Sequence, residues 1–424
     1  MLDIRFIREN TDLIKAAARK KHVEVDLDKL IKLDDERREL QVAVDQLRAE
    51  QNAASEKVAA ATDDIERQRV IDEVRSFKGD LTEKEERLKK VIKQWQTLMV
   101  AVPNIPDMSV PEGDSDADNL EVRTWGEKPH FSFEPVDHLE LMKAHRMLEA
   151  ERGAKVAGFR GYFLRGSAVR LSMGLQQFVL EEFADRGYEP LIAPSLVRRE
   201  PFVGTGYLPQ GEEDLYQTQD EMYLAGTAEV ATMGMYMDEV LDREQLPIKF
   251  LAYSPCFRRE AGSHGKDTKG LIRVHEFMKL EQVILCEARH QTSVELHEEL
   301  TENAERLLQK LELPYRVVVN CGGDLGLGQV KKYDLEAWVP SQRQFRETHS
   351  SSYFHDFQTR RLNIRYRDED GKMRFAHSLN NTALATPRIL VPLLENNQRE
   401  DGSIAVPEVL QRYVGTDVLT APTD

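Results

Sequence analysis

Two runs of apolar residues at heptad spacing occupy much of the first hundred positions of the chain. One run lies between about residues 28 and 61, and the other lies between residues 74 and 98. Each keeps the alternation of three and four residues that gathers apolar side chains into one seam of a helix. Arg37, Gln51 and Lys84 interrupt the seams. The seam residues are Leu30, Leu33, Leu40, Val44, Leu47, Ala54, Val58 and Ala61, then Val74, Phe77, Leu81, Leu88, Val91, Trp95 and Leu98.

The segment between the two runs, ATDDIERQ at residues 61–68, is short and polar. Two helices with so short a connection should fold back as an antiparallel hairpin. At 1.5 Å per residue, about 34 residues make an arm on the order of 50 Å long. Such an arm is most often a spacer or a dimerisation element, and heptads alone do not choose between these roles.

The pattern changes after Leu98. Residues 101–119 read AVPNIPDMSVPEGDSDADN, with three prolines and an acidic, polar end. Proline does not continue a helix, so this composition is typical of a linker. We therefore expect an N-terminal domain over residues 1–110 and a second domain over residues 111–424.

The second domain interleaves helical segments with short β-rich runs. Turn residues, rather than regular crossover helices, separate these runs. The pattern therefore favours an antiparallel sheet within an α+β domain. The runs are LPIKFLAYSPCF, LEQVILC, YRVVVN, YDLEAWVP and LNIRYR.

The formal net charge of −16 is unevenly distributed. Residues 1–100 hold 21 Lys/Arg and 22 Asp/Glu, a net charge of −1, so the other 324 residues hold 37 and 52, a net charge of −15. An anionic polymer is therefore repelled less by the N-terminal domain. There is no run of about 18 apolar residues and no apolar segment at the N-terminus, which predicts a cytoplasmic protein without a membrane span or signal peptide. The three cysteines, Cys256, Cys286 and Cys321, lack CxxC spacing, which argues against disulfides and a cysteine zinc site.

Residues 256–277, CFRREAGSHGKDTKGLIRVHEF, are basic within this acidic chain, with five Lys/Arg against three Asp/Glu. We expect two strands, KFLAYSPCFRRE and LIRVHEFMKLEQVILC, joined by the glycine-bearing loop AGSHGKDTKG. Arg258 and Arg273 then lie at the strand ends, where guanidinium groups suit phosphate oxygens. An aromatic ring such as that of Phe277 can stack on a base. A basic hairpin alone is more often a solvated loop, and the specific feature is the order Phe-Arg-x-Glu, loop, Arg-x-x-x-Phe.

That order resembles motif 2 of the class II aminoacyl-tRNA synthetases. Together with GTAEV, KKYDLEAWVPSQ, ENNQREDG, VPEVLQRY, the N-terminal MLDIRFIREN and the linker NIPDMSVP, it is similar to the seryl-tRNA synthetase family over nearly the whole chain. The resemblance implies an α+β fold, in which a class II synthetase antiparallel β-sheet core flanked by helices follows an N-terminal antiparallel coiled-coil arm. It also implies a homodimer, with YEPLIAPSLVRREPFVGTGYLP as motif 1 around Pro194.

The implied reaction activates L-serine with ATP to seryl-adenylate, with Mg²⁺ present. The seryl group then passes to the 3′ end of tRNA(Ser), bound by the arm, and of tRNA(Sec) where that tRNA exists. Two alternatives stay open: a synthetase-like paralogue that activates an amino acid for a non-tRNA carrier, and a non-catalytic RNA-binding scaffold. The intact arm argues against the first, and the retained Arg258, Glu260, Glu347 and Arg388 argue against the second.

The resemblance also assigns site residues. Arg258 would bridge the α-phosphate and the serine carboxylate, Glu260 would contact the adenine side, and Arg388 would meet the terminal phosphates; these three form the catalytic set. Phe277 would stack on adenine. The ATP-binding set is Arg258, Arg259, Glu260, Phe277, Glu347, Thr348, His349, Ser350 and Arg388, of which Glu347 and Ser350 are the metal ligands. The serine-binding set is Thr227, Ala228, Glu229, Arg258, Glu281 and Thr382.

The chain also departs from the family pattern. His349 stands where the family usually has Ser, Asn381 replaces a frequent Gly, and Tyr353 replaces a frequent Asn. Ala383 and Pro387 take the places of motif 3 glycines. Proline is tolerated in the first turn of a helix, which is the position we expect for Pro387. We interpret His349 as a neutral replacement rather than a new catalytic base.

Overall fold

The computed structural model describes residues 1–424 except 61–63, 263–268 and 423–424, and it leaves undescribed the side chains of residues 58–60, 64, 66–67 and 69–77. The chain divides into two compact units. One, the arm unit, comprises residues 2–19 and 23–103. The other, the core unit, comprises residues 1, 20–22 and 104–424.

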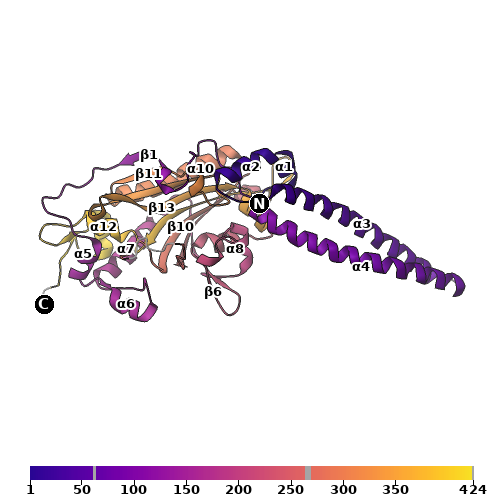
Figure 1. Cartoon of the computed structure of the whole chain (residues 1–424). Helices are drawn as coiled ribbons and strands as arrows, with labels where there is room; N and C mark the ends of the chain where they lie inside the picture. The colour runs from indigo at the N-terminus through magenta and orange to yellow at the C-terminus, as the bar shows by residue number, and fades with distance from the viewer. Residues whose placement is uncertain (61–63, 263–268, 423–424) are drawn as a thin grey trace. The chain divides into compact units, whose positions relative to one another are not determined.

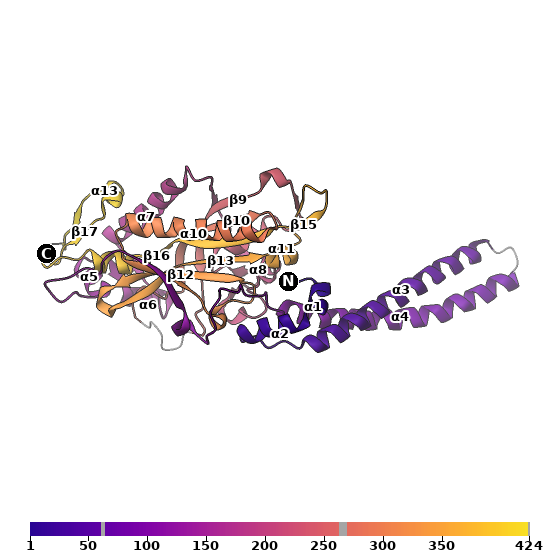
Figure 2. The same cartoon turned by 90° about the horizontal axis from the view of Figure 1, so that it is seen from above.

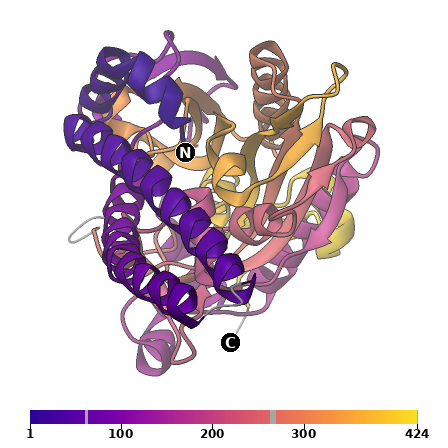
Figure 3. The same cartoon turned by 90° about the vertical axis from the view of Figure 1, so that its right-hand side faces the viewer.

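The arm unit is a helical hairpin preceded by two short helices, α1 (Ile4–Glu9) and α2 (Thr11–Lys20). Its long helices α3 (Leu27–Ala60) and α4 (Asp64–Ala101) lie antiparallel, side by side (Figures 1, 2 and 3). Among the heptad residues whose side chains are described, buried Val44, Leu81 and Leu88 form one cluster in the seam. The side chains of Val58, Ala61, Val74 and Phe77 lie outside the described part of the chain. The predicted hairpin is thus confirmed.

The connection between the long helices is shorter than predicted, because α4 begins at Asp64 and includes the last five residues of ATDDIERQ. The polar interruption at Arg37 is accommodated by contacts within the seam. Its guanidinium lies 5.0 Å from the centre of the Trp95 ring and donates to Asp34 at 2.8 Å.

The described part of the core unit is built on an eight-stranded sheet with strand order β1-β11-β12-β13-β16-β10-β9-β4. Neighbouring strands are antiparallel except β4 and β9, which are parallel, so the predicted antiparallel α+β class is confirmed. The strands are β1 (Leu120–Trp125), β4 (Glu189–Ile192), β9 (Ile248–Phe257), β10 (Glu276–Cys286), β11 (Tyr315–Val319), β12 (Lys331–Val339), β13 (Gln344–His355) and β16 (His377–Thr386).

Helices cover the sheet and complete its core. Helix α10 (His290–Lys310) packs across β13 and β16 (Figure 2) and buries Leu296, Leu300, Ala304 and Leu307, three or four residues apart. The other helices are α5 (His138–Ala144), α6 (Ala150–Ala157), α7 (Ser167–Phe183), α8 (Arg199–Thr205), α9 (Ala228–Gly234), α11 (Phe357–Leu362), α12 (Leu390–Asn396) and α13 (Glu408–Val414).

Short strands form small additional sheets. They are β2 (Leu148–Glu149), β3 (Phe163–Leu164), β5 (Leu196–Val197), β6 (Tyr216–Gln217), β7 (Tyr223–Leu224), β8 (Val240–Leu241), β14 (Arg365–Arg367), β15 (Met373–Phe375), β17 (Ile404–Ala405) and β18 (Val418–Leu419). No helix among the described residues is long and apolar enough to cross a membrane.

Three predicted strands are shorter than their sequence runs. The run KFLAYSPCFRRE leaves the sheet after Phe257, so Arg258 lies just beyond the end of the strand. The run LIRVHEFMKLEQVILC enters the sheet only at Glu276, because residues 271–275 turn and bury Leu271 and Val274. The run LNIRYR contributes only Arg365–Arg367, in a separate small sheet. Residues 263–268 of the predicted loop AGSHGKDTKG lie outside the described residues. The central strands β13 and β16 were not among the predicted strands.

Candidate active site

A cavity of about 300 Å³ lies on the side of the central sheet where β10, β12, β13 and β16 present polar side chains. Most of the predicted site residues line it, although they come from distant parts of the sequence. Ala228, Arg259 and His349 are absent from the lining. The predicted residues that line the cavity are Thr227, Glu229, Arg258, Glu260, Phe277, Glu281, Glu347, Thr348, Ser350, Thr382 and Arg388.

Strand β10 supplies one row of the lining. Phe277, Lys279 and Glu281 are two residues apart, so their side chains share one face of the sheet. Lys279 and Glu281 are both buried and form an ion pair. Glu281 lies opposite Thr382 in β16, which brings a carboxylate and a hydroxyl together.

A bulge in β13 brings a second group into the cavity. Glu347 and Ser350 are three residues apart and would face opposite sides of a regular strand. In β12, however, Leu335 pairs with His349 and Glu336 pairs with Glu347, so Thr348 is an extra residue. As a result, Glu347, Thr348 and Ser350 all line the cavity.

His349 faces away from the cavity lining and is buried. Its Nε2 contacts the carbonyl oxygen of Ala383 at 3.2 Å, and its Nδ1 contacts the hydroxyl of Thr348 at 2.8 Å. Burial lowers the pKa of His349 to about 4, so the imidazole is uncharged at neutral pH.

One end of the cavity is rich in cationic groups. Arg258 donates from Nε to the carbonyl oxygen of Gly226 at 3.3 Å, and its guanidinium lies 5.4 Å from the centre of the Phe277 ring. Arg273 forms an ion pair with Glu260 at 2.9 Å. Lys332 of β12 also lines this end. Cations and an aromatic face are the groups that bind a polyphosphate and a base.

Arg388 and Glu347 form an ion pair within this cationic end, with 3.5 Å between Nη1 and Oε1. Burial opposes ionisation of Glu347, but Arg388 and Lys332 outweigh this effect and hold its pKa below the ordinary value. Arg388 also donates from Nε to the carbonyl oxygen of Ile272 at 3.0 Å. Glu347 is therefore a carboxylate at neutral pH, with a fixed cation beside it.

The other end of the cavity carries two buried carboxyl groups, Glu229 and Glu281. Glu229 follows Thr227, the N-cap of α9, whose hydroxyl accepts from the Glu229 N–H at 3.3 Å. The Glu229 carboxyl accepts from Gln358 at 2.6 Å and from the hydroxyl of Tyr207 at 3.0 Å. Burial, with a contribution from Glu281, raises the pKa of Glu229 to about 7 despite these hydrogen bonds. Acidic groups with hydroxyls beside them suit a small ammonium compound that carries a hydroxyl.

The residues that depart from the family pattern occupy different environments. Asn381 is buried and donates to the carbonyl oxygen of Leu300 at 2.7 Å, on the side of the sheet that α10 covers. Tyr353 donates to Asp107 at 3.0 Å. Ala383 is the extra residue of a bulge in β16, between the partners of Leu280 and Glu281.

The helical position expected for Pro387 is wrong. Pro387 lies in a turn that follows β16 and lines the cavity, whereas α12 begins only at Leu390. The turn is closed by the N–H of Leu390, which donates to the carbonyl oxygen of Pro387 at 2.9 Å.

Sequence reasoning assigned no role to several lining residues. Lys279 shares the two-residue alternation of Phe277 and Glu281, and this spacing could have identified it. Tyr207 follows α8 within the predicted motif 1 stretch, but that stretch was assigned only to the dimer interface and not to the cavity. The other lining residues without an assigned role include Gln329, Lys332, Ser352 and Asn380.

Comparisons with known proteins cover both units. Residues 1–106 match the family model of the seryl-tRNA synthetase N-terminal domain, and residues 213–397 match that of the tRNA synthetase class II core domain (G, H, P, S and T). The chain is 46% identical to a serine–tRNA ligase of Deinococcus radiodurans, over 100% of both chains. It is 43% identical to a serine–tRNA ligase of Rubrobacter xylanophilus, over 99% of both chains. A crystal structure of a seryl-tRNA synthetase from Pyrococcus horikoshii complexed with ATP matches with a TM-score of 0.90 and 36% identity, over 100% of both chains.

Proposed function

The chain belongs to the seryl-tRNA synthetase family, and we propose that its cavity binds ATP and L-serine side by side and joins them as seryl-adenylate. The division of the cavity into two ends carries this proposal. The cationic end holds Arg258, Arg388 and the ring of Phe277. The acidic end holds Glu229 and Glu281, of which Glu281 is ion-paired with Lys279. An amino acid that points its ammonium group to the acidic end directs its carboxylate toward the nucleotide.

Arg258 has the central role in the proposed reaction. A serine carboxylate oxygen attacks the α-phosphorus of ATP and forms a new P–O bond, while the bond to the β-phosphate breaks and pyrophosphate leaves. Arg258 contacts both the Phe277 ring and the backbone next to Thr227, so its guanidinium can meet the serine carboxylate and the α-phosphate together. Such positioning and charge neutralisation supply most of the rate enhancement in transfers of this kind.

Arg388 stabilises the negative charge on the leaving pyrophosphate, and Glu260 orients Arg273 through their ion pair. In the second step, a hydroxyl of the terminal ribose of tRNA(Ser) attacks the seryl carbonyl carbon and AMP leaves. The chain then acts on tRNA(Sec) as well where that tRNA exists.

The acidic end determines the choice of amino acid. Glu229 and Glu281 bind the ammonium group, and Thr382 lies beside the serine hydroxyl. A site that is built to bind a hydroxyl disfavours alanine by roughly 10⁴ or more, because its buried polar groups are then left unpaired.

Glu347 and Ser350 fit a role as Mg²⁺ ligands. Both line the cavity, both offer the hard oxygen atoms that Mg²⁺ prefers, and the lowered pKa of Glu347 keeps it ionised. Among the described residues, no group of three or more His, Cys, Asp or Glu could hold a metal ion. Glu347 and Ser350 would therefore be the ligands that this chain supplies to Mg²⁺. Mg²⁺ supplies charge neutralisation for the phosphates when it is bound.

The arm unit and a second copy of the chain complete the proposed enzyme. The arm recognises the shape of tRNA(Ser), mainly through contacts to the RNA backbone, in keeping with the near-neutral charge of residues 1–100. The chain acts as a cytoplasmic homodimer, with the segment around Pro194 at the interface.

The first test is amino-acid-dependent exchange of pyrophosphate into ATP with Mg²⁺, comparing serine, threonine, alanine and cysteine. We expect strong exchange with serine alone, followed by serine-specific charging of tRNA(Ser). Exchange with another amino acid, or with none, contradicts the proposal, and exchange without charging favours the paralogue.

A matched pair of variants tests the site itself. Arg258→Lys removes the planar guanidinium from the cavity and should lower kcat/KM for exchange by about 10² or more, because lysine cannot make the same bidentate contacts. Arg152→Lys is the control, because Arg152 of α6 is exposed, lies outside the lining and belongs to none of the predicted site sets. Equal losses in the two variants argue against the proposed role of Arg258.

A further inference from the structure

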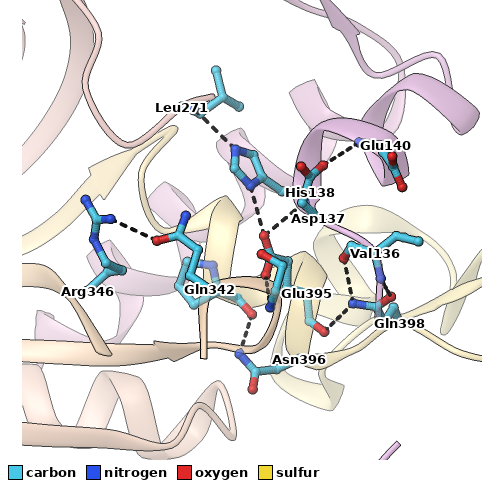
Figure 4. A network of polar contacts seen from close by, with 12 residues as sticks. Val136, Asp137, His138, Glu140, Leu271, Gln342, Arg346, Glu395, Asn396 and Gln398 are labelled. Atoms are coloured by element: carbon cyan, nitrogen blue, oxygen red, sulfur yellow. Dashed lines mark hydrogen bonds and ion pairs between the residues drawn. The ribbon is translucent and has the colours of Figure 1, made fainter. Parts of the chain in front are cut away.

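A buried histidine and a buried glutamate lie behind the cavity and belong to no part of the proposed chemistry. His138 is the first residue of α5 and is 4% exposed, and Glu395 lies near the end of α12 and is 0% exposed. Figure 4 shows the two side chains pointing toward one another, with Leu271 above the histidine ring. His138 Nδ1 and the backbone N–H of His138 both lie 2.9 Å from the same oxygen, Oε1 of Glu395.

The contacts of His138 fix the position of its ring proton. The backbone N–H of Leu271 points at Nε2 of His138 over 3.4 Å, and an N–H can only donate. Nε2 therefore accepts, and the proton resides on Nδ1, from which it is donated to Glu395. The second oxygen of Glu395 accepts the N–H of Ser341 at 3.1 Å. Both oxygen atoms of the buried carboxyl group are thus paired.

His138 accepts a hydrogen bond from Leu271, and the next residue along the chain, Ile272, accepts one from Arg388. The carbonyl oxygen of Ile272, directly after Leu271, accepts from Nε of Arg388 at 3.0 Å. Arg388 in turn lies in the turn that leads into α12, the helix that carries Glu395. These contacts form a closed circuit that runs from α12 through His138 and residues 271–272 to Arg388 and back to α12.

The backbone passes very close to the histidine at this point. Gly270 has a φ angle of +89°, which favours glycine, and a Cβ atom added there would lie 2.5 Å from Nε2 of His138. A larger residue at position 270 would therefore displace either the loop or the imidazole. Such close approach is expected where a backbone segment is held in one position.

We propose that His138 and Glu395 are positioning residues that hold residues 270–273 against α12 and so aim Arg388 and Arg273 into the cavity. This inference rests on the proposed function, because it takes the cationic end of the cavity as the ATP side. Among the described residues, the circuit meets the cavity at its cationic end, through Ile272 and Arg388. Loss of the circuit should therefore weaken the use of ATP and leave the use of serine unchanged.

Two substitutions of His138 in the full-length chain separate the two contacts of its ring. Asparagine mimics Nδ1 and can still donate to Glu395, but it cannot reach the N–H of Leu271. Glutamine mimics Nε2 and can still accept from Leu271. In serine-dependent pyrophosphate exchange, we expect His138→Asn to raise KM for ATP about fivefold to tenfold, since a buried N–H is left unpaired. KM for serine should change by less than about twofold. His138→Gln should keep KM for ATP close to the wild-type value.

His145→Asn is the matched control. His145 is a buried histidine at the C-cap of the same helix, and its Nε2 contacts the carbonyl oxygen of Gly402 at 2.8 Å, away from residues 270–273. This variant should lose stability without a change in KM for ATP. An unchanged KM for ATP in His138→Asn, or an equal rise in His145→Asn, overturns the inference.

Hydrogen exchange provides a readout that does not depend on activity. His138→Asn should increase the exchange rate of the Leu271 amide severalfold, and His145→Asn should leave it unchanged. An unchanged exchange rate of the Leu271 amide in His138→Asn overturns the inference by itself. If the wild-type chain shows no serine-dependent exchange while the amide responds as expected, the proposed function fails and the structural circuit stands.

Discussion

Glu229 shows how burial adjusts a single side chain within the cavity. Its pKa of about 7 means that near neutral pH the carboxyl group changes between a neutral and an ionised form. Only the ionised form attracts an ammonium group strongly. Ammonium binding therefore has to supply the free energy that desolvation of the carboxylate costs.

A pH dependence of serine use follows from this pKa. We expect kcat/KM for serine in pyrophosphate exchange to rise between pH 6 and pH 8, because deprotonation of Glu229 creates the carboxylate that we propose binds the ammonium group. Glu229→Gln should lower kcat/KM at all pH values and remove this rise. A profile for Glu229→Gln that keeps the rise would assign the titration to another group, and kcat/KM for ATP serves as the internal control.

At the level of elements, predictability followed the kind of side chain that each element buries. The hairpin of α3 and α4 buries apolar side chains at heptad spacing, and β9 and β10 contain short apolar runs such as FLAY and VILC, so the sequence could identify these elements. Strands β13 and β16 lie at the centre of the sheet but read QFRETHSSSYFH and HSLNNTALAT. Their polar residues form the cavity on one side and bond α10 on the other, so hydrophobic periodicity could not identify them.

The candidate site also contains some residues that the sequence could identify and others that it could not. Residues within long motifs, such as Arg258 and Glu347, could be assigned from the sequence because the resemblance covers them. The bulge at Thr348 could not, since the extra residue is visible only in the pairing of β12 with β13. Tyr207 was missed because a loop brings it to Glu229 across more than twenty positions of sequence.

The seam of the hairpin can be tested with two valines of α3. Val44 is 1% exposed and packs against Leu81 and Leu88, whereas Val42 on the same helix is 67% exposed. Val44→Ala should destabilise the arm by about 2 kcal/mol through lost packing, and Val42→Ala should change it by less than about 0.5 kcal/mol. Urea unfolding followed by helical circular dichroism measures both. Equal effects would contradict the described seam.

For the whole molecule, the division into two units suggests that amino-acid activation and tRNA selection are separable. The site residues that the structure brings together all belong to the core unit, and the hairpin belongs to the arm unit. A change confined to the hairpin should therefore leave adenylate formation intact.

A shortened arm tests this separation. Arg48 and Glu85 form an ion pair across the hairpin at 2.7 Å, so residues 49–84 can be replaced by a short glycine-serine turn. We expect pyrophosphate exchange to stay within about twofold of the wild type, because the cavity is untouched, while charging of tRNA(Ser) falls at least about tenfold. Undiminished charging would refute the proposed RNA-binding role of the arm.

The polar centre of the sheet also affects the newly made chain before it folds. Segments that seed intermolecular β-aggregates combine high hydrophobicity with few charges, and β13 and β16 lack that combination. The two central strands are thus poorly suited to seed aggregates while the chain is unfolded. The more hydrophobic segments, such as VILC in β10 and YRVVV in β11, lie further from the centre of the sheet. A sheet whose central strands are polar because they line a cavity should therefore also be less prone to aggregate while the chain is unfolded.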